Sequence, residues 1–234
     1  MNKFLIITGG SSGIGYAAAL LFQKENYKVI NLSRSKIPLS EAIHVSVDLS
    51  TSSWHEEIDS VLKDLLDSAD QISLIHNASK MQSDNVEDFN LSELRDVIEV
   101  NLVAPAILNK MIIPYMKKGS SIIYVGSTLS EKAVPQMSSY VTTKHAMIGL
   151  MRSTCQDLFG RFIHTACVCP GATETEMLQE YVQGNTEALE MMAGTLSENR
   201  LITPEEIAST LLFCSQNSVI NGSVIHANLG ILSP

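Results

Sequence analysis

Short runs of apolar, β-branched residues alternate with longer amphipathic stretches along the whole chain. Most of the short runs are continuously apolar, which is typical of strands covered on both faces of a sheet. This alternation predicts an α/β fold, with one doubly wound parallel β-sheet of about seven strands flanked by helices. The expected strands are residues 4–7, 29–32, 44–47, 73–75, 121–125, 164–168 and 223–226, and the expected helices are residues 13–24, 54–67, 91–117, 138–159 and 204–215.

The length of 234 residues suits one domain with a full hydrophobic core. We see no repeat, low-complexity segment or linker, so residues 1–234 are expected to form a single domain. The segment 172–203 breaks the alternation, and long irregular segments in compact domains are often lids. Its methionines, Met177, Met191 and Met192, suit an adaptable apolar pocket. They suit equally well a lid that packs on its own domain.

The chain is acidic, with 25 Asp and Glu residues against 16 Lys and Arg residues and a formal net charge of -9. This balance argues against nucleic acid and membrane surfaces as partners. The apolar run after Met1 is too short for a signal segment or a membrane span, which favours a soluble, cytoplasmic protein. The four cysteines form no C-x-x-C pair. We interpret them as small buried apolar residues and expect no metal site.

A glycine-rich loop, Thr8-Gly9-Gly10-Ser11-Ser12-Gly13-Ile14-Gly15, follows the first predicted strand and opens the first predicted helix. A phosphate that approaches a helix N-terminus needs free N–H groups and no Cβ atoms in its way. An ordinary glycine-rich turn is the alternative, but the position at the expected switch point of an open sheet favours phosphate binding. The residues expected to bind there are Gly9, Ser11, Ser12, Gly13, Ile14 and Gly15.

With this loop the chain resembles the short-chain dehydrogenase/reductase family, whose signature is T-G-x-x-x-G-x-G. Further motifs of the family follow in the family's order over essentially the full length. They are Asp48-Leu49, His76-Asn77-Ala78-Ser79, Asn101, Ser127, Tyr140-x-x-x-Lys144, Pro170-Gly171 and Thr175. The resemblance implies a Rossmann-like fold and an NAD(P)-dependent oxidoreductase that acts on CH–OH or C=O groups.

The end of the second predicted strand bears on the choice of cofactor. Members of the family that prefer NAD carry an acidic residue there, which accepts hydrogen bonds from the adenosine ribose. Ser33 stands at that position here, and Arg34 follows it. A guanidinium binds a 2′-phosphate through charge-assisted hydrogen bonds, whereas a carboxylate repels it. We therefore expect NADP(H), the alternative being that Arg34 is a solvated surface residue.

The resemblance also implies the other contacts to the cofactor. They are Asp48, Leu49, Asn77, Ala78, Ser79, Pro170, Gly171 and Thr175, together with Tyr140 and Lys144. The family commonly has Asn-Asn-Ala-Gly where this chain has His76-Asn77-Ala78-Ser79. Ser79 thus puts a side chain where glycine leaves room near the cofactor, and His76 is expected to be structural.

Tyr140 and Lys144 lie four residues apart in a predicted helix and therefore share one face. A tyrosine with an ordinary pKa near ~10 is a poor acid–base group at neutral pH, and a neighbouring cation can lower that pKa. The resemblance makes Tyr140 the acid–base group and gives Lys144 a second role as a ligand of the nicotinamide ribose. Ser127, at the end of the fifth predicted strand, would hydrogen-bond the substrate oxygen.

Asn101 is the fourth residue of the implied catalytic set. In the family, the main-chain carbonyl at this position holds a water in a proton relay that passes through the lysine. Pro105 lies four residues later and has no N–H to donate to that carbonyl, which predicts a free carbonyl and a kinked helix. An incidental kink in a packing helix is an equally good interpretation.

The substrate is the least constrained part of the prediction. The segment 172–203 carries six glutamates and a single basic residue, Arg200, and an acidic lid disfavours an acidic acyl-carrier protein. We expect a small carbonyl or alcohol substrate, with a 3-oxoacyl-carrier-protein reductase or a sepiapterin-type reductase as alternatives. A redox-sensing NADP(H)-binding protein is a further alternative, although such proteins usually lose the tyrosine or the lysine.

Self-association is expected from the helix 138–159. Apart from the Tyr140 and Lys144 face, this helix carries an apolar stripe, and an unpaired stripe of that size is unusual on a monomer. The stripe is formed by Met147, Ile148, Leu150, Met151 and Leu158. Members of the family usually pair through their two long helices, so we predict a dimer or a tetramer.

Overall fold

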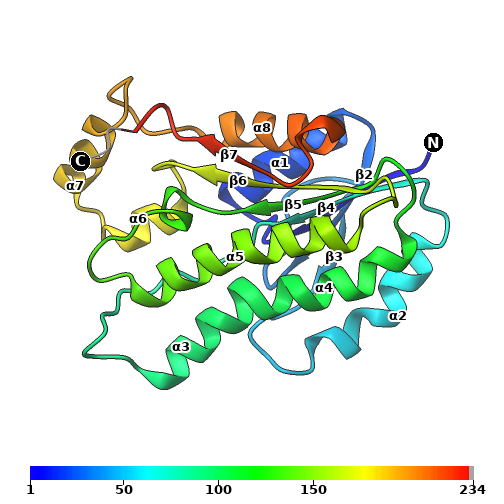
Figure 1. The fold of residues 1–234 in the computed structure, drawn as a ribbon, viewed down its shortest axis with the longest axis horizontal. Coiled ribbons are helices and arrows are strands. Elements are labelled where there is room, and N and C mark those ends of the chain that lie inside the picture. Colours follow the sequence, from blue (N-terminus) through cyan, green and yellow to red (C-terminus); the bar gives the residue numbers. More distant parts are fainter. Residues whose placement is uncertain (232–234) are drawn as a thin grey trace.

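The computed structural model describes residues 1–231 and contains one parallel sheet of seven strands with helices on both faces (Figure 1). The strand order is β3-β2-β1-β4-β5-β6-β7. The strands are β1 Lys3–Thr8, β2 Tyr27–Ser33, β3 Ile43–Ser46, β4 Gln71–His76, β5 Ser121–Val125, β6 His164–Pro170 and β7 Ser223–Ala227. The predicted doubly wound α/β fold is confirmed. The expected single domain reaches to residue 234, and residues 232–234 lie outside the described part.

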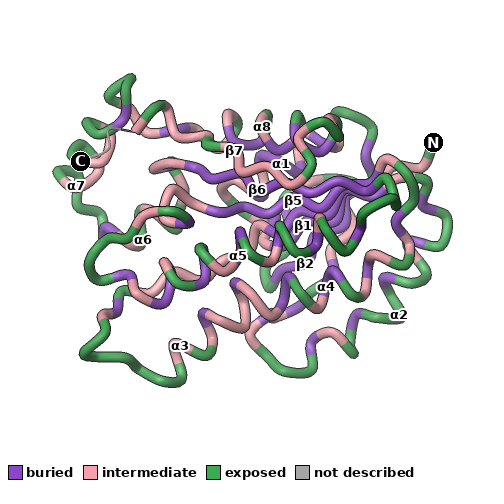
Figure 2. The backbone as a smooth tube through the Cα atoms, in the orientation of Figure 1, coloured by how far each residue is buried: buried purple, intermediate pink, exposed green. Residues whose placement is uncertain are grey.

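Two layers of helices cover the sheet. Helices α1 (Gly13–Lys24) and α8 (Pro204–Gln216) lie on one face, and α2 (Trp54–Leu66), α4 (Ala104–Ile112) and α5 (Ser138–Asp157) lie on the other (Figure 1). Successive strand residues point to opposite faces, so Leu5 and Ile7 join one core cluster while Phe4 and Ile6 join the other. Figure 2 shows the central strands as buried along most of their length, as their continuous apolar sequences predicted.

The predicted helix 91–117 is interrupted beside Asn101. It consists of α3 (Leu91–Ile98), a π-helical turn η1 (Glu99–Val103), α4 and a short 3₁₀ turn η2 (Ile113–Tyr115). The N–H of Ala104 donates to the carbonyl of Glu99, five residues back instead of four. The expected irregularity before Pro105 is therefore present as a π-helical turn, a feature frequent at functional sites.

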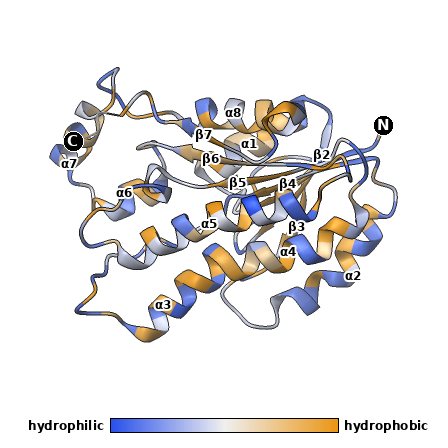
Figure 3. Ribbon diagram, viewed as in Figure 1, coloured by the Kyte–Doolittle hydropathy of each residue, from blue (hydrophilic) through white to orange (hydrophobic). Residues whose placement is uncertain are grey.

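The segment Leu91–Tyr115 is long and apolar enough, by length and composition alone, to cross a membrane. Figure 3 shows its apolar character, which is strongest along α4. Val97, Ala104, Leu108 and Ile112 are nevertheless fully buried in the protein's own core. We interpret the segment as a core helix.

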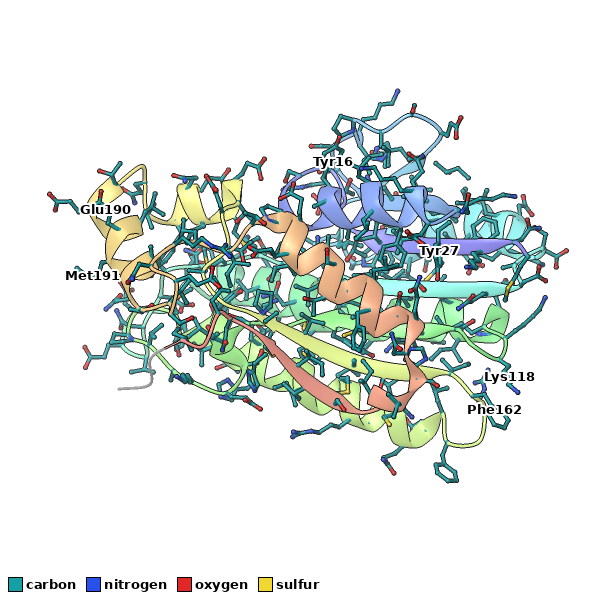
Figure 4. All side chains as sticks on the ribbon, turned by 90° about the horizontal axis from the view of Figure 1, so that it is seen from above. Tyr16, Tyr27, Lys118, Phe162, Glu190 and Met191 are labelled. Atoms are coloured by element: carbon teal, nitrogen blue, oxygen red, sulfur yellow. The ribbon has the colours of Figure 1, made fainter. Side chains whose placement is uncertain are left out.

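The segment 172–203, expected to be irregular, contains two short helices. It contains α6 (Glu176–Tyr181) and α7 (Thr186–Gly194), which Thr175 and Asn185 cap by accepting hydrogen bonds from backbone N–H groups. The two ends of the segment bind each other, because the N–H of Glu174 donates to the carbonyl of Ile202 at 2.8 Å. Met191 lies at the outer end of the segment (Figure 4) and is 75% exposed. It is not among the described residues that line the main cavity.

The apolar stripe on α5 packs inside the protein, against the expectation that it is unpaired. Met147, Ile148 and Met151 are buried against the sheet, and Leu158, just beyond the helix, is buried in the same core cluster. Leu150 is partly buried against that cluster. These residues need no second copy of the chain to cover them, so the stripe gives no support for self-association.

Candidate active site

The sheet order creates a crevice at the carboxyl ends of β1 and β4. These strands are neighbours, but the chain leaves β1 for α1 on one face and leaves β4 for α3 and α4 on the other. The hydroxyl of Thr8, the last residue of β1, accepts hydrogen bonds from the N–H groups of Asn77 at 3.0 Å and Ala78 at 2.9 Å. This side chain fixes the loop after β4 beside the glycine-rich loop.

The glycine-rich loop leaves the N-terminus of α1 open. Within residues 1–231, the side chain of the N-cap residue Ser12 makes no capping hydrogen bond, unlike Thr175 on α6. The first N–H groups of α1 therefore remain available to an anion. The crowding around Gly15 excludes a side chain, since an added Cβ atom would collide with the carbonyl oxygen of Gly9. Gly13 also lies against Thr175, where an added Cβ atom would come within 3.1 Å of the threonine methyl group, and this contact brings the lid to the loop.

Asn31 holds the glycine-rich loop, a role that the sequence analysis missed. Its Oδ1 accepts a hydrogen bond from the N–H of Gly10 at 2.8 Å, and its Nδ2 donates to Ser33 Oγ at 2.8 Å. Asn31 is fully buried. The sequence did contain a signal for this role. An asparagine inside the apolar run 29–32 is expected to be buried, and a buried amide needs hydrogen-bond partners.

A cavity of about 710 Å³ lies over this edge of the sheet. Seven of the residues expected to bind the cofactor line it: Ser11, Ser12, Ser33, Arg34, Asp48, Leu49 and Ser79. The lid reaches it through Glu176, Met177 and Tyr181, and Lys80 and Val100 contribute although no motif singled them out. Among the described residues, the other expected cofactor contacts do not line this cavity: Gly9, Gly13, Ile14, Gly15, Asn77, Ala78, Tyr140, Lys144, Pro170, Gly171 and Thr175. The size of the cavity and its open helix N-terminus fit an elongated phosphorylated cofactor.

Both basic and acidic side chains line the cavity near the end of β2, among them Arg34 and Asp48. Arg34 is exposed and makes no ion pair within residues 1–231. The backbone N–H and the hydroxyl of Ser50 both donate to Asp48, and these hydrogen bonds lower the pKa of that carboxyl group. Lys80 is paired with Asp96 at 2.8 Å. Arg34 is therefore the cation best placed to receive an added phosphate.

Tyr140 and Lys144 lie together on the buried face of α5. The Lys144 Nζ is 5.4 Å from the centroid of the Tyr140 ring and donates to the carbonyl of Val125 at 2.8 Å. Burial raises the pKa of Tyr140 to about 12, while hydrogen bonds from Ser127 and Ser79 act in the opposite direction. Burial also lowers the pKa of Lys144 to about 8. The expectation that Lys144 lowers the pKa of Tyr140 is thus not met in this structure, where desolvation dominates.

Ser127 lies two residues after β5 and is the N-cap of the 3₁₀ turn η3 (Thr128–Ser130). Its hydroxyl accepts from the N–H of Leu129 at 3.1 Å, and its own N–H donates to Ser130 Oγ at 3.1 Å. This reciprocal capping fixes Ser127 in front of α5. The structure therefore brings Ser127, Tyr140 and Lys144 together as predicted.

Asn101 acts through its side chain in a way that the sequence did not predict. Its Oδ1 accepts from the N–H of Lys80 at 2.7 Å, and its Nδ2 donates to the Lys80 carbonyl at 2.9 Å. The same Nδ2 donates to Thr143 Oγ1 at 3.0 Å. Asn101 thereby joins the loop after β4 to the helix that carries Tyr140.

His76, Cys167, Cys169 and Cys214 are buried, in keeping with their expected structural roles, whereas Cys155 is only partly buried and departs from that expectation. Burial lowers the pKa of His76 to about 4, and its Nε2 lies 2.8 Å from Asn109 Oδ1. Cys167 and Cys169 share one face of β6, as expected, with their sulfurs 3.9 Å apart.

Comparison with known proteins agrees with this geometry. A sequence model described as "short chain dehydrogenase" matches residues 3–186. The chain belongs to the short-chain dehydrogenase family. It is a nicotinamide-dependent oxidoreductase of that family, with the parallel sheet and nucleotide-binding crevice of a Rossmann-like fold.

Relatives in the short-chain dehydrogenase family cover the whole chain. The 3-oxoacyl-[acyl-carrier-protein] reductase FabG of Thermotoga maritima is 28% identical over 99% of this chain and 98% of its own length. The solved aldohexose dehydrogenase of Thermoplasma acidophilum has a TM-score of 0.90 at 26% identity and covers 100% of this chain and 96% of its own. A 4-hydroxyisoleucine dehydrogenase, solved in complex with NADH, has a TM-score of 0.86 at 28% identity, with coverages of 98% and 99%.

Proposed function

We propose that the protein is an NADP(H)-dependent oxidoreductase that exchanges a hydride with a small carbonyl or alcohol compound. The observation that carries the proposal is the grouping of Tyr140, Lys144 and Ser127 next to Ser79, which lines one cavity together with Ser11, Ser12 and Arg34. A tyrosine with a neighbouring lysine and a second hydroxyl is the set of groups that proton transfer to a carbonyl oxygen requires. The nicotinamide, when bound, supplies the hydride.

In the direction of reduction, Tyr140 donates its proton to the substrate oxygen, which Ser127 holds by a hydrogen bond. The loss of that proton leaves a phenolate, and the Lys144 ammonium stabilises it by charge. The main-chain carbonyl of Asn101, at the π-helical turn, holds the water through which the proton is replaced. Burial of Tyr140 keeps bulk water away from the transfer.

The residues proposed to hold the cofactor divide by position. Gly9, Ser11, Ser12, Gly13, Ile14 and Gly15 receive its phosphates at the start of α1, with Thr175 at the lid. Ser33 and Arg34 would hold the 2′-phosphate, and Asp48 and Leu49 would contact the adenine. Asn77, Ala78 and Ser79 would contact the ribose and nicotinamide, Lys144 would bind the ribose, and Pro170 and Gly171 would contact the nicotinamide end.

The name of the Thermotoga maritima relative, a 3-oxoacyl-[acyl-carrier-protein] reductase, makes acyl-carrier-protein substrates the second candidate. The lid argues against it, because the exposed carboxylates of Glu174, Glu176 and Glu180 would repel an acidic carrier. A redox-sensing role without turnover is the other alternative. It is disfavoured because the acid–base pair Tyr140 and Lys144 is present.

The deciding experiment is an assay of NADPH oxidation against small ketones, diketones, quinones and a 3-oxoacyl thioester, the last presented free and on carrier protein. We expect turnover with at least one small carbonyl compound and weaker activity with the carrier-bound thioester. A preference for the carrier-bound form would establish the second candidate. Tight NADPH binding with no turnover on any member of the panel would favour the sensor.

Self-association and a cytoplasmic location are proposed on family grounds. The outer side of α4 is a better candidate for the contact than the buried stripe on α5, since Ile107 and Met111 are only partly buried. We expect light scattering at micromolar concentration to show a dimer or a tetramer. Replacing Ile107→Glu should shift that species toward the monomer, because a charge would be buried in the contact. A monomeric wild type would refute the proposal.

A further inference from the structure

Ser79 puts a hydroxyl group where the family commonly has glycine, at the centre of the proposed proton-transfer site. Its Oγ donates to Asn101 Oδ1 at 3.2 Å. The same hydroxyl lies close enough to the Tyr140 phenol to lower its pKa, as does the hydroxyl of Ser127 after β5. Ser79 also lines the cavity, so it lies between the cofactor space and two residues of the catalytic set.

The backbone on either side of Ser79 is fixed. The N–H of Ala78 donates to Thr8 Oγ1 at 2.9 Å, and both backbone groups of Lys80 bind the Asn101 side chain, at 2.7 and 2.9 Å. Ser79 is therefore held between β1 and the π-helical turn. A hydroxyl held in this way needs little reorganisation to act on a neighbouring charge.

The Ser79 hydroxyl can leave Asn101 for another acceptor without leaving a buried polar group unpaired. When Tyr140 loses its proton, the Ser79 O–H can rotate from Asn101 Oδ1 to the phenolate oxygen. Asn101 Oδ1 keeps the hydrogen bond from the N–H of Lys80. The exchange replaces a hydrogen bond between neutral groups by a stronger one to a charged group.

We propose that Ser79 is a further catalytic residue, whose hydroxyl donates a hydrogen bond to the Tyr140 oxygen as Tyr140 transfers its proton to the substrate. Ser79 keeps its own proton throughout. This inference rests on the proposed function, because it assigns the stabilisation of the tyrosinate to three groups: Lys144, Ser127 and Ser79. The inference also gives a role to the Ser79 side chain, which would otherwise only reduce the space for the cofactor.

The test is the pH dependence of kcat/KM for carbonyl reduction in Ser79→Ala, Ser79→Gly and Ser79→Thr. Without the donor, the phenolate is less stable and the pKa of Tyr140 rises. Reduction needs protonated Tyr140, so the fall in activity at high pH should move upward by about one unit in the alanine and glycine variants. At neutral pH their kcat should fall about tenfold with little change in KM for NADPH. The threonine variant, which keeps the hydroxyl, should retain the wild-type profile.

The other groups that act on Tyr140 are unchanged in these variants. In the described residues they are Lys144 on the same helix, Ser127 after β5 and Cys169 on β6. Cys169 in turn lies near Cys167, and the negative charge of Glu131 acts to raise the pKa of the Cys169 thiol. Ser127→Ala provides the comparison, because it removes the other hydroxyl that hydrogen-bonds Tyr140.

A second measurement separates this inference from the proposed function. The tyrosinate absorbance of the NADP⁺-bound protein is titrated, and the curve of Tyr140→Phe is subtracted to isolate Tyr140. We expect Tyr140 to titrate at higher pH in Ser79→Ala than in the wild type. Equal titration midpoints in the two proteins would overturn the role of Ser79, even if the enzyme is active. A shifted midpoint in a protein that reduces no carbonyl compound would uphold the contact and refute the proposed function.

Discussion

Replacing Tyr140→Phe is expected to lower turnover by a factor on the order of 10² or more, the usual scale for loss of a positioned acid–base group. The change removes one hydroxyl and keeps the ring, which is buried on α5. The variant should therefore fold normally and bind NADPH about as well as the wild type. Stopped-flow measurement of hydride transfer and a fluorescence titration of NADPH would check the two expectations separately.

Two further variants make this result specific. Lys144→Ala should weaken both turnover and cofactor binding, because we assign that side chain to both. Tyr27→Phe is the matched control, since Tyr27 is buried in β2 at the opposite end of the molecule from the lid (Figure 4). It should leave kcat unchanged. Near-normal turnover by Tyr140→Phe on a good substrate would place the chemistry elsewhere in the chain.

Replacing Arg34→Asp is expected to weaken NADPH binding by a factor on the order of 10² and to leave NADH binding unchanged or improved. A charge-assisted hydrogen bond to the 2′-phosphate is lost, and a like charge is placed against that phosphate. NADH has no 2′-phosphate, and a carboxylate at this strand end can accept hydrogen bonds from its ribose. Titration of both reduced cofactors against wild type and variant measures the change in preference.

Lys36→Asp is the control for this experiment. It makes the same change of charge two residues away, on an exposed side chain that is absent from the cavity lining in the described residues. Its effect on NADPH binding should be several times smaller than that of Arg34→Asp. Wild-type protein that binds NADPH and NADH equally well would show that Arg34 does not select the cofactor.

The sequence predicted those parts of the fold that depend on local pattern. All seven strands lie at or near their expected positions, because continuous apolar runs mark strands buried on both faces. The start of α1 was predicted correctly at Gly13, because the glycine-rich loop separates the apolar run of β1 from the helical pattern that follows it. The lid helices α6 and α7 were missed, although Thr175 and Asn185 are recognisable N-cap residues ahead of short helical segments.

The contacts within the site could not be predicted, because they join residues that are far apart in the chain. The pairing of Asn101 with Lys80, of Asn31 with Gly10 and of Ser79 with Asn101 depends on which strand lies beside which. The prediction that a second copy of the chain covers the apolar stripe on α5 was wrong for a related reason. Periodicity shows that a helix face is apolar but does not show whether the protein's own sheet or another chain covers it.

The mutual binding of the two ends of segment 172–203 has an evolutionary consequence. Because the N–H of Glu174 donates to the carbonyl of Ile202, the segment leaves and rejoins the body of the protein at neighbouring points. Further contacts tie it down, among them Thr175 beside Gly13 and the N–H of Ser197 on the carbonyl of Leu229. The stretch between these contacts, which contains α7, can change in length and sequence without moving α8 or the sheet. New substrate preferences can therefore arise by changing residues 184–194, while Thr175, the rest of the cofactor site and the proton-transfer residues stay as they are.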